Sequence, residues 1–264
     1  MAIEVDAEVR TSFQELQMDY SYQLYSARNE ASLDETLKTL KSLGYTYVEG
    51  WGGQFGDPAA LARSLKNAGL SMPTAHIGYD QLLDTDSVLR IADTVGIETI
   101  FCPAPPSVDY RGGDGDWSVL ADGLAKIGAA IRKGGRGFGY HNHHWEFVKQ
   151  ANGKMPIELI LGSPGVDWEM DLAWTIKAGQ DPVALMEKLG SRIVAMHVKD
   201  MAPAGEKADE DGWADVGTGT LDWKSYLATA RSKTKAKYFV AEHDKPSDAI
   251  RFARNSITNL KQWG

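Results

Sequence analysis

Residues 33–49 read Leu33-Asp-Glu-Thr-Leu-Lys-Thr-Leu-Lys-Ser-Leu-Gly-Tyr-Thr-Tyr-Val-Glu49, and this stretch decides the fold. Its leucines stand at positions 33, 37, 40 and 43, which is the spacing of one buried face of an amphipathic helix. Gly44 is a typical helix stop, and the five residues after it are typical of a short strand. The stretch therefore predicts one unit made of a helix, a glycine and a strand.

The same unit recurs along the chain. Further helices are predicted at 58–68, 87–95, 120–133, 183–189, 223–231 and 247–262. Strands are predicted at 20–25, 45–49, 70–76, 97–102, 137–141, 165–171, 193–197 and 238–242. Alternating strands and helices indicate a parallel sheet, because parallel neighbours need a crossover connection. Eight strands in 264 residues favour a single (β/α)8 TIM barrel, one domain spanning residues 1–264.

An open doubly wound sheet is the alternative fold. Its usual nucleotide-binding fingerprint, G-x-G-x-x-G after the first strand, is absent from the sequence. The polar stretch 202–220 lies between the seventh predicted strand and its helix, where a barrel would carry an active-site loop. Both observations favour the closed barrel.

Composition and charge exclude several classes of protein. Hydrophobic residues make up 43% and charged residues 24%, which is typical of a globular chain with a sizeable core. The net charge of −8 argues against a nucleic-acid partner, since such binding needs a basic face. The sequence has no apolar run long enough for a membrane span and no N-terminal signal-peptide pattern. Cys102 is the single cysteine, which excludes an internal disulfide and leads us to expect a cytoplasmic protein.

Carboxylate and imidazole side chains gather at the ends of the predicted strands. They are Glu49, His76, His141, Asp171, His197 and Glu242, with His143 and Glu146 just after the fifth strand. The carboxyl ends of barrel strands open on one face, so these side chains should converge. Converging anions and imidazoles need a cation. The pattern predicts one divalent metal ion, and Mn²⁺, Mg²⁺, Co²⁺, Fe²⁺ and Zn²⁺ all suit such donors.

Taken singly, two of these residues have simpler interpretations. Asp171 could cap a helix, and His197 could be a hydrogen-bonded core histidine. Glu242 is harder to explain in that way, because an ionised carboxylate ending a buried strand needs a partner.

Several motifs, in order, carry a resemblance to a known family. They are Gln23-Leu-Tyr-Ser26, Tyr140-His-Asn-His-His-Trp-Glu-Phe147, Asp167-Trp-Glu-Met-Asp171, His197-Val-Lys-Asp200, Val216-Gly-Thr-Gly219 and Ala241-Glu-His-Asp244. Over nearly its whole length the chain resembles the xylose-isomerase-like TIM barrels. That family includes sugar isomerases, sugar epimerases and a subgroup that acts on keto-sugars.

The resemblance implies four metal ligands, one from each of the last four strands. Three fall on Asp171, His197 and Glu242. Many family members carry a glutamate where this chain has His141, and the nearest carboxylate here is Glu146, within the Y-H-N-H-x-x-E-F pattern of the keto-sugar subgroup. We expect Glu146 to be the fourth ligand, with His141 as the alternative.

The resemblance also implies proton abstraction next to a sugar carbonyl that the metal polarises. In the family's epimerases two ligating glutamates move the proton. Glu242 corresponds to one of them, but His141 stands where the other would be, so the resemblance leaves that pair incomplete here. His143 is then the expected base, since imidazole titrates near neutral pH, unless it only hydrogen-bonds within a loop. Lys199 should assist proton transfer or bind substrate, unless it pairs with Glu169 or another inward acid. These departures favour a lyase or eliminase acting on a 3-keto-glycoside, without excluding isomerisation or epimerisation.

We expect a small sugar or glycoside as the partner, more readily than a sugar phosphate, because no basic cluster accompanies the glycines at 217–219. The candidate substrate-binding residues are His76, His141, Trp174 and Glu49, the last of which could instead anchor the barrel floor. Two other functions remain as hypotheses: a metal-dependent abasic-site endonuclease and a non-catalytic sugar-binding barrel. Assembly into a homo-oligomer stays open.

Overall fold

A computed structural model describes residues 19–112, 115–151 and 153–263. Eight parallel strands close into a barrel in the order β1, β10, β7, β6, β5, β4, β3, β2. Their bounds are β1 Tyr20–Gln23, β2 Tyr47–Trp51, β3 Ser71–His76, β4 Thr99–Cys102, β5 Gly137–His141, β6 Asp167–Asp171, β7 Ile193–Val198 and β10 Tyr238–Ala241. The predicted (β/α)8 barrel is confirmed, and the open doubly wound sheet is excluded.

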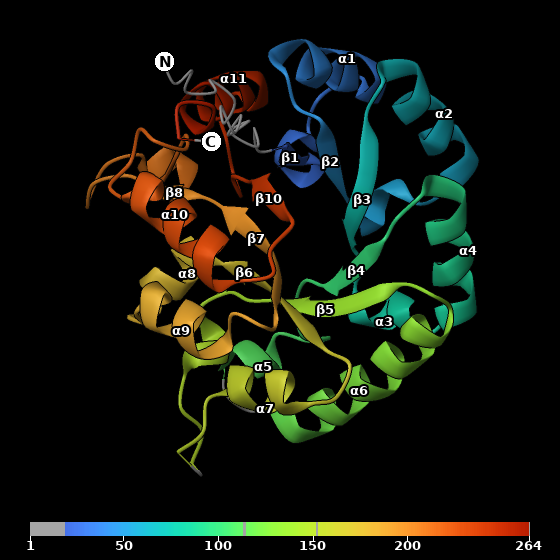
Figure 1. Ribbon diagram of the computed structural model, residues 1–264, viewed down its shortest axis with the longest axis vertical. Coiled ribbons are helices and arrows are strands. Elements are labelled where there is room, and N and C mark those ends of the chain that lie inside the picture. Colours follow the sequence, from blue (N-terminus) through green and yellow to red (C-terminus); the bar gives the residue numbers. More distant parts are fainter. Residues whose placement is uncertain (1–18, 113–114, 152, 264) are drawn as a thin grey trace, which may run out of the picture.

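A ring of helices surrounds the strands (Figure 1). They are α1 Leu33–Leu43, α2 Pro58–Ala68, α3 Tyr79–Leu82, α4 Thr85–Val95, α5 Asp109–Gly112, α6 Trp117–Lys133, α7 Pro156–Gly162, α8 Leu172–Lys177, α9 Pro182–Leu189, α10 Trp223–Lys233 and α11 Ala249–Leu260. Leu37 and Leu40 of α1 are fully buried, as the leucine spacing predicted. The short helices α3, α5, α7 and α8 were not predicted, because four to seven residues carry too little periodicity.

The glycine stops divide into two kinds. Gly44, Gly69 and Gly96 have φ values of +96°, +70° and +90°, the left-handed conformation expected of a helix-ending glycine. Gly190 instead keeps a right-handed conformation. A Cβ atom there would lie 1.9 Å from the carbonyl oxygen of Lys233, so glycine is required for close backbone approach.

The polar stretch 202–220 is ordered by a small antiparallel hairpin, β8 Asp200–Met201 with β9 Trp213–Ala214. Within it, the buried Glu210 accepts hydrogen bonds from the Ser247 amide and from Arg251 of α11. These contacts tie the loop to the last helix.

The structure bears on two expectations from the sequence, those about the single cysteine and about membrane-spanning helices. Cys102 is a buried free thiol. In the part of the chain that the structure describes, every helix is too short or too polar to cross a membrane. The N-terminal segment on which the signal-peptide expectation rests lies outside the described residues.

Candidate metal centre and active site

Asn142 joins the ends of β5 and β6. Its side-chain oxygen accepts hydrogen bonds from the Trp168 indole at 2.8 Å and from the Asp171 amide at 3.0 Å, and its amide donates to the Asp171 carbonyl. His141 before it is buried at the end of β5, and both His141 and His143 line the cavity described below. The Y-H-N-H motif therefore places two histidines at the cavity, on either side of an asparagine that is fixed to β6.

Glu146 braces the segment that follows β5. The Tyr140 hydroxyl donates to one carboxylate oxygen at 2.7 Å, and the His143 amide donates to the other at 2.8 Å. Burial raises the pKa of Glu146 to about 7. Among the described residues Glu146 belongs to neither cluster that could hold a metal, so the structure does not bring it to the other three predicted ligands. His141, the alternative, is the strand-five residue found with them.

Four buried side chains, which we call the outer group, converge at the ends of the last strands. They are His141, Asp171, His197 and Glu242, and one donor atom from each lies within 4.8 Å of the others. His197 Nδ1 is 2.8 Å from a Glu242 oxygen. One Asp171 oxygen caps α8 by accepting from the Trp174 amide at 2.8 Å, while the other makes no hydrogen bond to the described residues and lies 3.2 Å from the Lys199 ammonium. Asp171 is thus a helix cap and a member of the group at once.

The outer group fits a divalent cation. Its donors are two carboxylates and two imidazoles, the ligand types that first-row divalent metals prefer in proteins. Two carboxylates also balance the charge of one divalent ion. Among the described residues, the second oxygen of Asp171 makes no hydrogen bond and contacts only the Lys199 ammonium, so it can serve as a metal donor.

Lys199 lies against the carboxylates of this group and is fully buried. Its Nζ is 2.9 Å from Glu242, 3.2 Å from Asp171 and 2.8 Å from Asp244. Burial alone would lower the pKa of Lys199, but the three acids raise it. Burial alone would raise the pKa of Glu242, but Lys199 and His197 hold it well below its usual value. The pairing foreseen for Lys199 exists, although Glu169 is not one of its partners.

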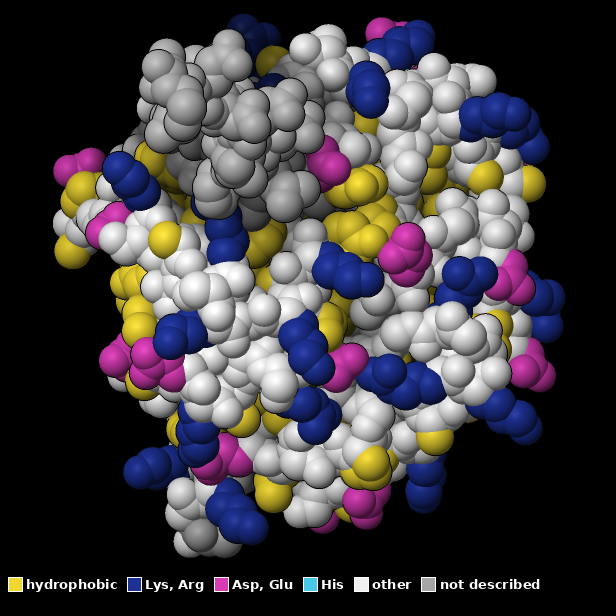
Figure 2. Space-filling model, viewed as in Figure 1, with side chains coloured by type: hydrophobic (Ala, Val, Ile, Leu, Met, Phe, Trp, Pro, Cys, Tyr) yellow, Lys and Arg dark blue, Asp and Glu magenta, His cyan; other side chains and the backbone are white. Residues whose placement is uncertain are grey.

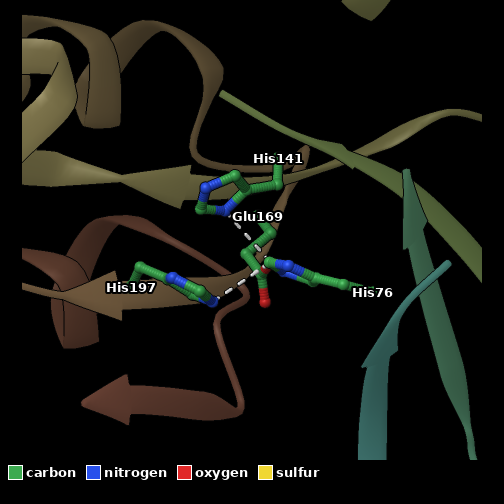
Figure 3. A group of neighbouring side chains, drawn as sticks. All are labelled: His76, His141, Glu169 and His197. Carbon is green, nitrogen blue, oxygen red and sulfur yellow. Dashed lines mark hydrogen bonds and ion pairs between the residues drawn. The ribbon is translucent and has the colours of Figure 1, made fainter. Parts of the chain in front are cut away.

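A second layer lies deeper in the barrel. Glu169 precedes Asp171 by two residues on β6 and so faces the same way one step below it. His76 Nε2 is 2.5 Å from Glu169, and Figure 3 shows these two side chains with His141 and His197 around them. Glu49 lies 3.2 Å from His76 Nε2 and 2.7 Å from His197 Nε2. Burial and the Glu49 charge raise the pKa of Glu169 to about 7. Burial would also raise the pKa of Glu49, but the two imidazoles lower it to about 2.

A cavity of about 870 Å³ opens above these layers. Its lining includes Trp51, Trp145, Trp174, Trp213, His76, His141, His143 and Glu242. Three of the candidate substrate-binding residues, His76, His141 and Trp174, therefore line it. Glu49 does not, since it is fully buried below. Four tryptophan rings give the cavity the apolar walls that suit the C–H faces of a sugar.

His143 lies at the wall of this cavity, beside two other rings. Its ring stacks on Trp145 with centroids 4.3 Å apart and lies 5.1 Å from the ring of His141. Its buried Nδ1 has no hydrogen-bond partner among the described residues. Burial, followed by the charge of Lys199, lowers the pKa of His143 well below its usual value, so the ring is neutral. A neutral imidazole with a free nitrogen beside a cavity can act as a base.

The sequence analysis missed the roles of Glu169, Asp244 and Asn142. Glu169 and Asp244 each stand two residues from an expected ligand, Asp171 and Glu242. Strand alternation was the available signal for Glu169, since it puts every second side chain on the same side of the sheet. Asn142 carried no such signal, because its role depends on contacts with β6.

A parallel barrel with buried carboxylate and imidazole donors at the ends of its last strands defines a class of metal-site α/β barrels. Within that class, the chain belongs to the xylose isomerase-like TIM barrel family, whose model matches residues 37–262. The resemblance read from the motifs is confirmed.

Individual relatives match more distantly. An inosose dehydratase from Clostridium beijerinckii is 27% identical over 92 residues, which cover 35% of this chain and 31% of that protein. One from Lacticaseibacillus casei is 28% identical over 99 residues, covering 37% and 32%. The matched stretch thus spans about a third of these relatives.

Solved structures resemble the whole barrel. A sugar phosphate isomerase/epimerase from Parabacteroides distasonis has a TM-score of 0.75 at 23% identity, covering 97% of this chain and 98% of that one. An IOLI protein with a bound zinc atom has a TM-score of 0.71 at 13% identity, covering 93% and 98%. At these identities the likeness shows the fold.

Proposed function

We propose that this chain is a divalent-metal-dependent enzyme that removes a proton next to the carbonyl of a keto-sugar. We propose further that it acts as a lyase, expelling a β-leaving group from a 3-keto-glycoside or a related cyclic ketone. One observation carries the proposal: His141 and Glu242 of the outer group line the same cavity as the neutral His143. A metal-type site and a base therefore face one substrate-sized space.

The proposal assigns the metal to His141, Asp171, His197 and Glu242. A divalent ion held there would polarise the substrate carbonyl and favour loss of the neighbouring proton. The His143 imidazole would take that proton as the C–H electron pair forms a carbon–carbon double bond and the β-carbon–oxygen bond breaks. The resulting imidazolium would return its proton to the departing oxygen, releasing water or an alcohol.

The names of the curated relatives support the elimination over simple epimerisation, since dehydration is elimination with water as the leaving group. Isomerisation and epimerisation share the first proton transfer and differ in where the proton returns. The tryptophan-lined cavity suits a sugar or glycoside.

The endonuclease hypothesis is less well supported. The net charge is −8, whereas DNA binding needs a basic surface. On the face seen in Figure 2, basic and acidic side chains of the described residues are interspersed instead of forming one basic surface. The non-catalytic hypothesis predicts disrupted donors, but the outer group carries four intact ones among the described residues.

The decisive experiment is metal analysis of the purified protein together with solvent deuterium exchange into a 3-keto-glucoside and into inosose. We expect about one divalent ion per chain, and exchange or product formation that a chelator abolishes. Metal-free protein, or metal-loaded protein that neither exchanges nor converts either ketone, would sink the proposal.

The fourth ligand is tested by a matched pair of variants. His141→Gln removes a donor of the outer group, so metal affinity should fall strongly. Glu146→Gln should leave metal affinity within about tenfold, because both Glu146 oxygens already accept hydrogen bonds. The reverse result, measured by titration with Mn²⁺, would return the ligand role to Glu146.

A further inference from the structure

We propose that His76, His141, Glu169 and His197, which we call the inner group, form a second metal position. This position takes a borderline cation such as Zn²⁺ in place of the cation of the outer group. It is distinct from the proposed catalytic site, although two of its residues belong to both.

The four donors come from β3, β5, β6 and β7, and the three imidazole nitrogens lie around one carboxylate oxygen. His76 Nε2, His141 Nδ1 and His197 Nε2 lie 2.5, 3.2 and 3.3 Å from the same Glu169 oxygen, Oε2 (Figure 3). One donor atom from each residue lies within 4.8 Å of the other three. Donors bound to a tetrahedral zinc at about 2.0–2.2 Å lie about 3.4 Å apart. The His141 and His197 nitrogens already lie at nearly that distance from the Glu169 oxygen, and a cation would have to open the shorter His76–Glu169 hydrogen bond.

Hydrogen bonding leaves this group incomplete. Within the described ranges, His141 Nδ1 is buried and makes no hydrogen bond, although it lies 3.2 Å from a Glu169 oxygen. Glu169 Oε1 has no hydrogen-bond partner within these ranges either. Buried polar atoms are normally satisfied, and an unmet set of this kind needs an explanation. A cation bound to the imidazoles and the carboxylate supplies one.

The charge of the layer points the same way. Glu49 and Glu169 are both fully buried and interact with each other, and the other chargeable groups that contact them among the described residues are histidines. The outer group differs, because Lys199 lies against its carboxylates. A divalent ion in the inner group would balance two buried carboxylates that no lysine or arginine of the described ranges pairs with.

The two positions exclude each other. His197 directs Nδ1 at Glu242 of the outer group and Nε2 at Glu49 and Glu169. Filling both positions would make this ring bind two cations, which requires loss of its last N–H proton. One cation at a time is therefore expected. Three imidazoles and one carboxylate favour Zn²⁺ over Mg²⁺ or Mn²⁺, so zinc held here would withdraw His141 and His197 from the outer group.

The test uses the Asp171→Asn/Glu242→Gln double variant, which loses both outer carboxylates and keeps every inner donor. Titrations with Zn²⁺ and Mn²⁺ are compared with those of the wild type. We expect the variant to bind one Zn²⁺ with an affinity within about tenfold of wild type and to bind no Mn²⁺. Co²⁺ in the variant should show the intense visible absorption of a tetrahedral site. Loss of Zn²⁺ binding along with Mn²⁺ binding would overturn the inner position.

Adding His76→Gln to that variant should weaken Zn²⁺ binding by at least about 10–100-fold, the cost of losing even an outer-shell partner. His144→Gln is the matched control, because His144 belongs to neither group, and it should change nothing. Unchanged Zn²⁺ affinity in the His76 variant would refute the assignment.

If the His76 variant does not fold, Glu169→Gln in the wild-type chain answers the same question. It should weaken Zn²⁺ binding more than Mn²⁺ binding, and equal losses would contradict the proposal. Two Zn²⁺ ions per wild-type chain would contradict the mutual exclusion. All these experiments measure metal binding, so they test the inner position independently of the proposed keto-sugar chemistry.

Discussion

The outer and inner groups are built from the same residue types, yet their surroundings differ. The outer carboxylates pair with Lys199, and Glu242 reaches the tryptophan-lined cavity. Among the described residues, the deeper carboxylates of Glu49 and Glu169 contact each other, histidines and a glutamine, and neither lines the cavity. The two groups therefore differ less in residue type than in their depth in the barrel and in the presence of Lys199. The outer carboxylate Glu242 can meet a substrate in the cavity, whereas Glu49 and Glu169 can contact only the protein around them.

The largest effect is expected from breaking the outer group. Glu242→Gln keeps the side-chain shape but removes a charged donor of the outer group, so Mn²⁺ binding and turnover should both be lost. Titration with Mn²⁺ and a keto-sugar assay measure the two together. Retained metal with lost turnover would show that Glu242 is a catalytic group only.

His143→Gln separates the base from the metal. Metal content should stay unchanged, because His143 is not in the outer group, while deuterium exchange should fall by about 100- to 10,000-fold. His144→Gln, one residue along and more exposed, is the control and should exchange normally. Metal loss in the His143 variant would move this residue from base to ligand.

Lys199→Met removes the ammonium that distinguishes the outer group. The free energy of unfolding of the metal-free protein should fall by about 3–5 kcal/mol, because three carboxylates lose a buried partner. Added Mn²⁺ should stabilise this variant more than wild type, since the cation takes over two of those carboxylates. Denaturant unfolding with and without Mn²⁺ measures both effects.

The exposed Lys177, which contacts Trp174 and Trp213 only through their rings, provides the control. Lys177→Met should change stability little. Equal effects of the two substitutions would mean that the buried ion pairs contribute nothing.

The smallest effect is expected from the inner carboxylate Glu49. Its oxygen holds His197 Nε2 at 2.7 Å, which leaves Nδ1 turned toward Glu242. Glu49→Gln should therefore lower Mn²⁺ affinity by about 10–100-fold without abolishing binding. An unchanged affinity would show that the inner layer does not orient this histidine.

Local pattern determined much of this protein. Helical leucine spacing and the glycine stops predicted the barrel, because amphipathic periodicity and left-handed glycines act within a few residues. Strand ends then predicted that Asp171, His197 and Glu242 converge, because parallel strands in a barrel share one open face.

Tertiary structure alone decided the rest. His141, and not Glu146, joins the outer group because Tyr140 and the loop amide hold Glu146 aside. The inner group of β3, β5, β6 and β7 residues depends on the stagger between strands, which sets side chains from different strands at one depth. Sequence spacing specifies which way a side chain faces along its own strand, but the heights of neighbouring strands are set only when the barrel closes.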